Sequence, residues 1–314
     1  MASEPVVFVL MVGVFAAGCF ALRWPVSVSM LLASVAGLAA GGGFALGPVD
    51  AIRHLVEGTF GYVDTILTIA TAMIFMNAVR ASGALEALTA WVMKRFIRLP
   101  GLLLVMLTLV AMFPGMITGS SSAAVLTAGA VVAPMLLLLG LPGESAAALI
   151  AMAGILGMIA PPVNIPAMII GGGIDMPYVG FEVPLLLLTM PLAVFSALWF
   201  GWRHARGVDR AKVLAALDVS TLERYGFKLF LPILLVVALM VGDKALPSVF
   251  NLGMPLIFVI GTVAALFAGR KVALLRTAGE AMDQALPVLG ILVGVGMFIQ
   301  VMTLTGVRGF IVVN

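Results

Sequence analysis

Hydroxyl side chains gather at residues 115–123 (GMITGSSSA), in the middle of an otherwise apolar segment. The candidate site residues in this cluster are Gly115, Thr118, Gly119, Ser120, Ser121 and Ser122. Hydroxyl oxygens, and carbonyls exposed where a helix is broken, suit Na⁺, with Thr118, Ser120 and Ser122 as the expected ligands. A helix that starts near Ser122 would direct its N-terminal N–H groups to the same place, where they can bind an anion.

Close helix packing is the alternative explanation for this cluster, because Ser and Gly line many helix contacts in membranes. The helix breakers Pro114 and Gly115 stand directly before the hydroxyl residues. Irregular backbone at membrane depth normally lines a cavity or is buried in protein. We therefore favour a binding site at this position.

A pair of prolines interrupts a second apolar segment at residues 160–164 (APPVN). Pro161 and Pro162 lack backbone N–H groups, so the carbonyls of residues 157–159 lose helical partners, and Asn164 adds a polar side chain nearby. Taken alone, the motif is explained equally well as a simple proline kink. A broken helix that faces a broken hairpin is typical of secondary transporters. The candidate site residues here are Ala160, Pro161, Pro162 and Asn164.

Polar residues in the other apolar segments are few. Asn77 and Gln300 are further candidates, although each could simply hydrogen-bond between helices. Carboxylates are nearly absent from these segments, which argues against a proton relay and favours Na⁺ as the coupling ion. No histidine or carboxylate stands near the serine cluster, and no metal-binding or phosphate-binding motif is present. The sequence therefore predicts neither an enzyme nor a cofactor beyond a coupling ion.

The composition predicts the class of protein that carries these motifs. Of 314 residues, 63% are hydrophobic and 10% are charged, whereas soluble domains have roughly 25% charged residues. Only helices and closed barrels satisfy the backbone in lipid, and these apolar runs lack the alternation of a barrel. We expect an all-α polytopic membrane protein with about eight transmembrane helices and no nucleic-acid partner. The expected spans are 5–22, 25–43, 61–80, 145–170, 184–202, 228–246, 250–268 and 285–304.

Residues 101–140 are expected to form one re-entrant hairpin with the hydroxyl cluster at its tip. The arm 101–113 is about 20 Å long at 1.5 Å per residue, too short to cross a bilayer. Two full spans joined by a polar apex are the alternative. Residues 46–58 and 270–283 are short and amphipathic, as is 83–98, and we predict helices that lie in the membrane interface.

Basic residues predict the orientation in the membrane. Six Lys and Arg residues fall within 203–228, which marks this loop as cytoplasmic. Counting crossings backwards from this loop places the N-terminus outside the cell. Arg270, Lys271 and Arg276 mark a second cytoplasmic loop and agree with the same orientation.

The chain resembles itself at an offset of 223 residues. The matched pairs are Arg53 and Arg276, Glu57 and Glu280, Phe75 and Phe298, Asn77 and Gln300, Ser82 and Thr305, and Gly83 and Gly306. Five crossings precede the second copy, so its topology is inverted, a common plan of secondary transporters. The first repeat is 1–222. The second, 223–314, holds only three spans, which we interpret as a C-terminally truncated repeat without its hairpin.

Residues 112–173 resemble the large membrane subunit of the tripartite ATP-independent periplasmic (TRAP) transporters, within the ion transporter superfamily. The features that carry the resemblance are the TGSSS hairpin tip and the glycine-rich span that ends in the APPVN break. The resemblance implies two inverted halves and a sliding, elevator-type transport domain. It also implies Na⁺-coupled uptake of a small organic anion of the carboxylate type across the bacterial inner membrane.

Two partners follow from the same resemblance: a periplasmic substrate-binding protein and a small four-helix membrane subunit. The break reads PPV here where the family has PPS, and the second repeat lacks a TPTEA-like motif. The alternative is therefore a single-component citrate or divalent-anion symporter or antiporter of the same superfamily. A non-transporting membrane scaffold is a further alternative, although a scaffold has no need of two facing breaks.

Overall fold

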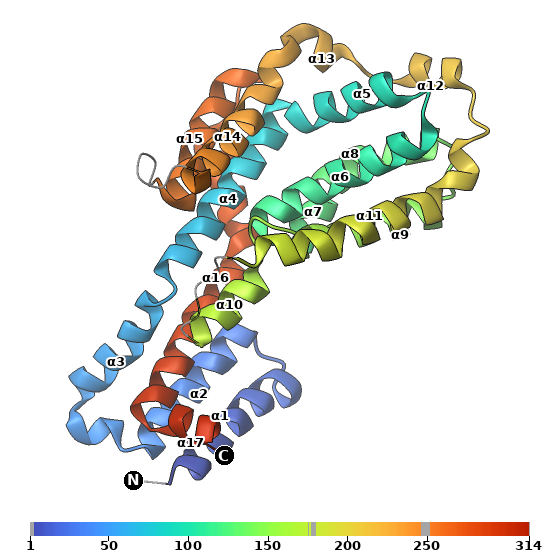
Figure 1. Ribbon diagram of the computed structural model, residues 1–314. Coiled ribbons are helices and arrows are strands. Elements are labelled where there is room, and N and C mark those ends of the chain that lie inside the picture. Colours follow the sequence, from blue (N-terminus) through green and yellow to red (C-terminus); the bar gives the residue numbers. More distant parts are fainter. Residues whose placement is uncertain (1–2, 175, 177–179, 246–251, 314) are drawn as a thin grey trace. The chain divides into compact units, whose positions relative to one another are not determined.

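The computed structural model describes residues 3–174, 176, 180–245 and 252–313. The described residues form helices, and no strand occurs among them. Seven of the described helical segments are long and apolar enough to cross a membrane, and three shorter apolar helices accompany them. The prediction of an all-α polytopic membrane protein is therefore confirmed (Figure 1). Residues 246 and 250–251, at the ends of two predicted spans, lie outside the described residues.

The first helices of the chain are α1 (Glu4–Ala16), α2 (Val26–Ala40), α3 (Pro48–Phe60), α4 (Val63–Ser82), α5 (Ala84–Phe96), α6 (Pro100–Thr118), α7 (Ser121–Ala124), α8 (Ala130–Leu138) and α9 (Gly143–Ile159). The remaining helices are α10 (Ile165–Gly173), α11 (Glu182–Ala205), α12 (Arg210–Ala216), α13 (Ser220–Tyr225), α14 (Leu231–Ala245), α15 (Gly253–Ala268), α16 (Leu274–Leu304) and α17 (Val307–Val313). A π-helical segment, Val125–Gly129, joins α7 to α8, so Ser121–Leu138 is one continuous helical arm. A second π-helical segment, Ala17–Ala21, extends α1.

The chain forms two compact units. Unit 1 holds Met1–Leu67, Met168–Pro177 and Ala285–Asn314, and unit 2 holds Thr68–Ala167 and Tyr178–Gln284. In unit 1, the C-terminal part of α16 packs on the α1–α2 pair, with Gly37 against the side chains of Met11 and Val301. The helix α3 meets α16 where the backbones of Gly58 and Gly296 touch, and a Cβ on either glycine would overlap the other's carbonyl oxygen.

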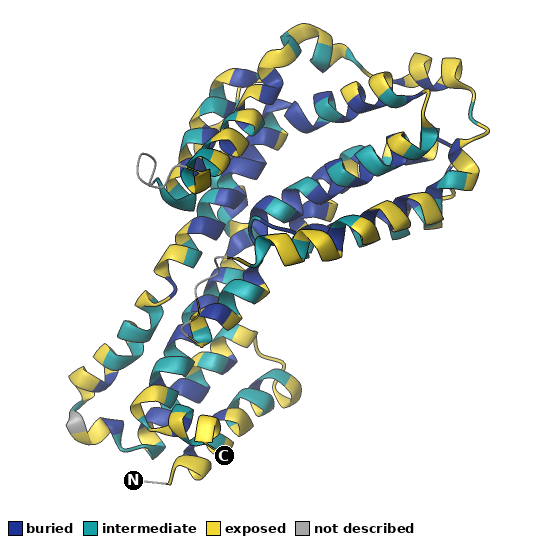
Figure 2. Ribbon diagram, viewed as in Figure 1, coloured by how far each residue is buried: buried dark blue, intermediate teal, exposed yellow. Residues whose placement is uncertain are grey.

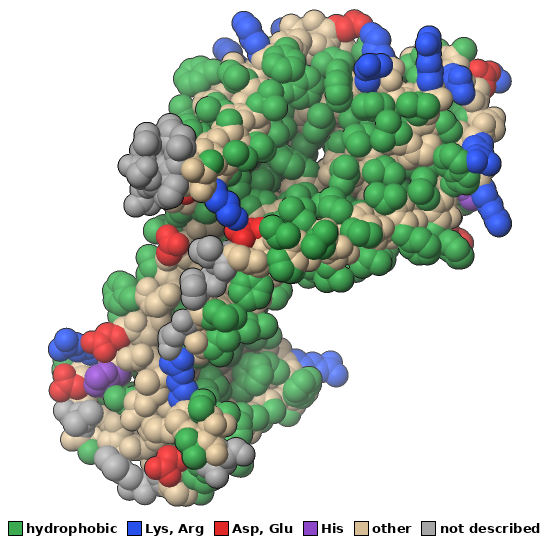
Figure 3. Space-filling model, viewed as in Figure 1, with side chains coloured by type: hydrophobic (Ala, Val, Ile, Leu, Met, Phe, Trp, Pro, Cys, Tyr) green, Lys and Arg blue, Asp and Glu red, His purple; other side chains and the backbone are tan. Residues whose placement is uncertain are grey.

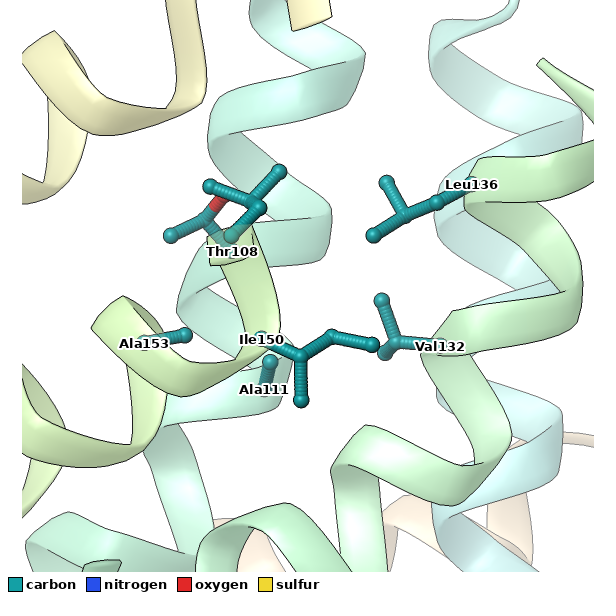
Figure 4. Close-up of a pocket in the computed structure, with 7 residues that line it drawn as sticks. Thr108, Ala111, Val132, Leu136, Ile150 and Ala153 are labelled. Atoms are coloured by element: carbon teal, nitrogen blue, oxygen red, sulfur yellow. The ribbon is translucent and has the colours of Figure 1, made fainter. Parts of the chain in front are cut away.

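The buried centre of unit 2 is α6, which packs against α5, α9 and α11 (Figure 2). Between the two hairpin arms and α9, the side chains of Thr108, Val132 and Ile150 converge (Figure 4). The space that they leave has no room for a water molecule. Thr108 donates its hydroxyl hydrogen to the carbonyl of Leu104 at 2.8 Å and stays within its own helix. The two arms and α9 therefore pack closely at this level.

Matched positions of the two predicted repeats adopt matching local structure. Arg53 Nε lies 3.0 Å from Glu57 Oε1, and Arg276 Nε lies 3.0 Å from Glu280 Oε1. After α4 comes a glycine with φ of +87°, Gly83, and α16 is followed by Gly306 with φ of +77°. Both glycines separate a long helix from the next one. These features support the offset, while the inversion of the second repeat stays a prediction.

Each compact unit combines helices from both predicted repeats. In unit 1, the first pair of helices, α1 and α2, packs on α16 of the second repeat. In unit 2, α14 and α15 of the second repeat pack on α4 of the first, with Phe75 stacked on Phe258 at 5.9 Å. The loop after α15 adds to this contact, because Arg270 donates its backbone N–H to Ser82 O at 3.0 Å. The first two spans of each predicted repeat therefore pack on the third span of the other, which is α4 or α16.

The predicted end of the first hairpin arm at residue 113 is wrong. The helix α6 continues through Pro114 to Thr118, because a proline removes only one hydrogen bond from the ladder and the turn beyond it still closes. Gly119, with φ of +63°, ends the helix and donates its N–H to Gly115 O at 2.7 Å. Each arm is about 28 Å long. The helix–turn–helix is confirmed, but arm length no longer excludes two full spans.

The predicted separate helix at 270–283 is also wrong, because residues 274–304 form the single helix α16. In the first repeat, Gly61 interrupts the chain between α3 and α4. The offset of 223 residues places Gln284 at the equivalent position. Glutamine is a good helix former and glycine is a poor one, so the second copy continues where the first breaks.

Candidate functional site

Four helix ends meet around the hydroxyl cluster of unit 2. The C-terminal ends of α6 and α9 come together there with the N-terminal ends of the Ser121–Leu138 arm and of α10. C-terminal ends carry partial negative charge on free carbonyls, and N-terminal ends carry partial positive charge on free N–H groups. The arrangement therefore offers cation ligands and anion ligands within one small region.

The hairpin tip is fixed by its own hydrogen bonds. Thr118 is fully buried, donates its hydroxyl hydrogen to Pro114 O at 2.7 Å and accepts the N–H of Ser120 at 3.3 Å. The Ser120 hydroxyl accepts the N–H of Ala123 at 3.3 Å and caps the second arm. Of the three Na⁺ ligands predicted from the sequence, Thr118 and Ser120 thus also have structural roles. Each of these two hydroxyls still has a lone pair for an ion.

The hydroxyls and backbone N–H groups of Ser121 and Ser122 have no hydrogen-bond partner among the described residues. Ser122 is exposed and Ser121 is half-buried, so both remain accessible at the first turn of the arm. Free N–H groups beside hydroxyl donors at a helix N-terminus are suited to binding a carboxylate or phosphate. The first turn of this arm is therefore a candidate anion site.

The break after α9 leaves carbonyl oxygens without helical hydrogen-bond partners, as the proline pair predicts. Pro161 and Pro162 stand four residues after Gly157 and Met158, so neither carbonyl accepts a helical hydrogen bond. The buried side chain of Asn164 donates to Ile159 O at 2.8 Å and accepts the N–H of Ala167 at 3.0 Å. Asn164 thus joins the C-terminal end of α9 to the N-terminal end of α10.

The structure brings the tip and the break into direct contact. The N–H of Val163 donates to Met116 O at 3.1 Å, which links the break to the end of α6. A Cβ on Gly119 would lie 2.6 Å from Ile165 Cγ1 and 3.2 Å from Val163 O. Of the site residues predicted from the sequence, those of the tip and those of APPVN therefore form one cluster.

The two further candidates, Asn77 and Gln300, lie in the long helices α4 and α16. Asn77 is buried in α4 and donates to Met73 O at 3.1 Å, one turn back in its own helix. Gln300 belongs to unit 1 and packs its Cβ near Gly58. A role for Gln300 in binding substrate or ion stays a prediction.

Backbone dipoles dominate the electrostatics of the site. Between Leu99 and Ile174, Glu144 is the only charged side chain in the sequence. The described residues contain no group of three His, Cys, Asp or Glu side chains that could hold a metal ion. Carbonyl oxygens are groups that bind cations, and backbone N–H groups are groups that bind anions, so this segment carries both kinds without a charged side chain at the tip or the break.

Comparison with known families decides the identity. Residues 12–311 match the family model described as tripartite ATP-independent periplasmic transporter, DctM component. The chain belongs to this family. A search of curated proteins gave no match. The resemblance drawn from the hairpin tip and the proline pair is thereby confirmed, and this DctM chain is a multi-pass membrane component of a TRAP transporter.

Two glycines of α9 that position the DctM site, Gly154 and Gly157, were not among the predicted residues, whereas their neighbour Gly115 was. A Cβ on Gly115 would lie 2.9 Å from the backbone C of Gly157, and a Cβ on Gly157 would overlap the carbonyl oxygen of Met112. Gly154 faces Ser121 in the same way, with its Cβ position 3.1 Å from Ser121 O. The spacing of Gly154 and Gly157 places both on one face of α9, and this small-residue pattern was the signal that could have identified them.

Proposed function

We propose that this DctM component moves a small organic anion of the carboxylate type across the bacterial inner membrane, coupled to Na⁺. The observation that carries the proposal is the meeting of four helix ends in unit 2. In this arrangement the anion binds the backbone N–H groups of Ser121 and Ser122 and the hydroxyl of Ser121, and the Ser122 hydroxyl is left for the ion. The Na⁺ binds the carbonyls of Gly157 and Met158 together with hydroxyl oxygens of the tip.

The tight packing of unit 2 supports movement of the site as a rigid body. The Gly115–Gly157 contact and the Val163–Met116 hydrogen bond hold the tip and the break together, so neither can open alone. An elevator-type mechanism, in which such a unit slides through the membrane with its cargo, needs this rigidity. We further propose the N-terminus outside the cell, as the basic loops indicate.

A TRAP component of this kind works with a periplasmic substrate-binding protein and a small four-helix membrane subunit, and we propose both as partners. Family membership favours this tripartite form over a single-component symporter. The test is uptake of candidate organic acids by proteoliposomes that contain the chain and both partners. We expect uptake under an inward Na⁺ gradient and none under a matched K⁺ gradient. Equal uptake under both gradients contradicts Na⁺ coupling, and uptake without the binding protein favours the single-component alternative.

The Ser122→Ala variant is expected to raise the Na⁺ concentration for half-maximal uptake by about tenfold, because a hydrogen bond or ion contact to a charged group contributes about 1.5–3 kcal/mol. The same proteoliposome assay, with Na⁺ varied at fixed substrate, measures this shift. Thr127→Val is the matched control. Its hydroxyl lies on the same arm but donates to Ala123 O, away from the free groups. An unchanged Na⁺ requirement in Ser122→Ala removes this residue from the ion site.

A further inference from the structure

The C-terminal half of α11 carries a shallow apolar groove of about 310 Å³, lined by Phe195, Leu198, Trp199 and Trp202. These positions recur at helical spacing and form one stripe. Phe195 is 59% exposed and Trp199 is 71% exposed, and their rings stack at 5.5 Å. The groove lies by the first turn of α6, where Gly101 meets the Trp202 ring, whereas the hairpin tip lies at the other end of that helix.

Two exposed arginines stand at the end of this groove. The guanidinium of Arg206 stacks over the Trp202 ring at 3.9 Å from the ring centroid. Arg203, one turn earlier, is also exposed, and among the described residues neither arginine forms an ion pair. Lys and Arg side chains gather over this end of unit 2 in Figure 3. Unpaired arginines beside an aromatic groove offer a place for an anionic group with an apolar tail.

The length of the stripe fits one leaflet of a bilayer. From Phe195 to Arg206 the helix rises about 16 Å, and one leaflet of a hydrocarbon core measures about 15 Å. Helix–helix contacts in membranes are rich in small residues, which let the backbones approach closely. This stripe instead projects large aromatic rings, which suits contact with lipid better than contact with another helix. Trp side chains beside basic residues are typical of the level of the lipid headgroups.

We propose that an anionic phospholipid binds along α11, with its phosphate at Arg203 and Arg206 and an acyl chain in the groove between Phe195 and Trp202. The Trp202 ring holds the Arg206 guanidinium in place for the phosphate, and the groove recognises the chain. This lipid site is independent of the proposed transport site, because it uses other residues at the opposite end of α6.

Tryptophan fluorescence tests this proposal on the full chain in detergent micelles. In a Trp24→Phe, Trp91→Phe background, Trp199 and Trp202 are the remaining tryptophans, since the sequence contains four. Phosphatidylglycerol with brominated acyl chains should quench them at about thirtyfold lower concentration than brominated phosphatidylcholine, about fivefold for each arginine. Arg206→Gln should remove about fivefold of this preference.

Arg224→Gln is the matched control, because Arg224 also stacks on an aromatic ring, that of Tyr225, at 5.4 Å. We expect no change in lipid preference from it. Equal quenching by the two lipids overturns the proposal, as does an equal effect of Arg206→Gln and Arg224→Gln. If the small four-helix membrane subunit abolishes quenching by both lipids, the groove is a protein interface and the proposal also fails.

Discussion

Replacing Gly157 by alanine is expected to abolish transport and to lower the free energy of unfolding by about 3 kcal/mol, the upper range for overpacking a filled contact. The new Cβ would overlap the carbonyl oxygen of Met112 and lie 3.0 Å from its Cα. These are backbone atoms, so no side-chain rotation relieves the overlap and α6 must move away from α9. A shift of this kind separates the hairpin tip from the proline break, and misplacement by 1 Å costs about a hundredfold at a preorganised site.

Gly143→Ala is the control for this change. Gly143 is the first residue of the same helix, and a Cβ there would have no neighbour within 4 Å. We expect Gly143→Ala to transport at the wild-type rate and to unfold at the wild-type temperature. Uptake in proteoliposomes and thermal unfolding in detergent measure both variants. Normal uptake by Gly157→Ala shows that the tip and the break need not touch, and removes the basis for a shared site.

Replacing Asn164 by leucine is expected to reduce uptake at least a hundredfold. The variant leaves the carbonyl of Ile159 and the N–H of Ala167, both partly buried, without their side-chain partner. Each polar group left unpaired away from water costs about 1–3 kcal/mol. The first turn of α10 then loses its cap and its fixed position against the end of α9. Asn164→Asp keeps the acceptor for Ala167 but loses the donor to Ile159, so we expect a smaller loss, of about tenfold.

Asn77→Leu provides the matched comparison, because Asn77 is also buried and donates to a carbonyl, but only within its own helix. We expect its uptake to stay within about threefold of wild type, since one local hydrogen bond contributes about 0.5–1.5 kcal/mol. Uptake is measured for all three variants in the same proteoliposomes. If Asn77→Leu loses as much activity as Asn164→Leu, the site is not confined to the tip and the break.

The sequence was sufficient to predict the class of fold and the two motifs of the candidate site. It was not sufficient to predict the residues at which the helices around them begin and end. The GSSS cluster and the proline pair indicate broken helices because their residue types act on the backbone directly. Proline removes a backbone N–H donor, and serine and glycine favour helix ends. The end of the first hairpin arm was predicted wrongly at Pro114. A proline can end a helix or lie within it, and the surrounding packing decides between the two. Here the left-handed Gly119 ends the helix one turn later.

Packing between distant segments explains what else the sequence did not show. The contact of Gly115 with Gly157 and the hydrogen bond from Val163 to Met116 join segments some forty residues apart. No local pattern predicts which glycine faces which backbone. The packing of α4 on α14 and α15 also could not be predicted from a local pattern. Phe75 and Phe258 are far apart in the sequence and stack only in the folded chain.

The central claim, that Na⁺ binds where the hairpin tip meets the proline break, is tested most directly by ion protection of an engineered cysteine. The chain has one natural cysteine, Cys19, which Cys19→Ser removes. Pro166→Cys then places a thiol at an exposed position in the first turn of α10, two residues after Asn164. Ile170→Cys, one turn farther along the same helix and 63% exposed in the native chain, is the control. We predict that Na⁺ slows maleimide labelling severalfold at position 166, relative to equal K⁺, and leaves position 170 unchanged. Equal labelling rates in Na⁺ and K⁺ at position 166 would contradict a Na⁺ site at this junction.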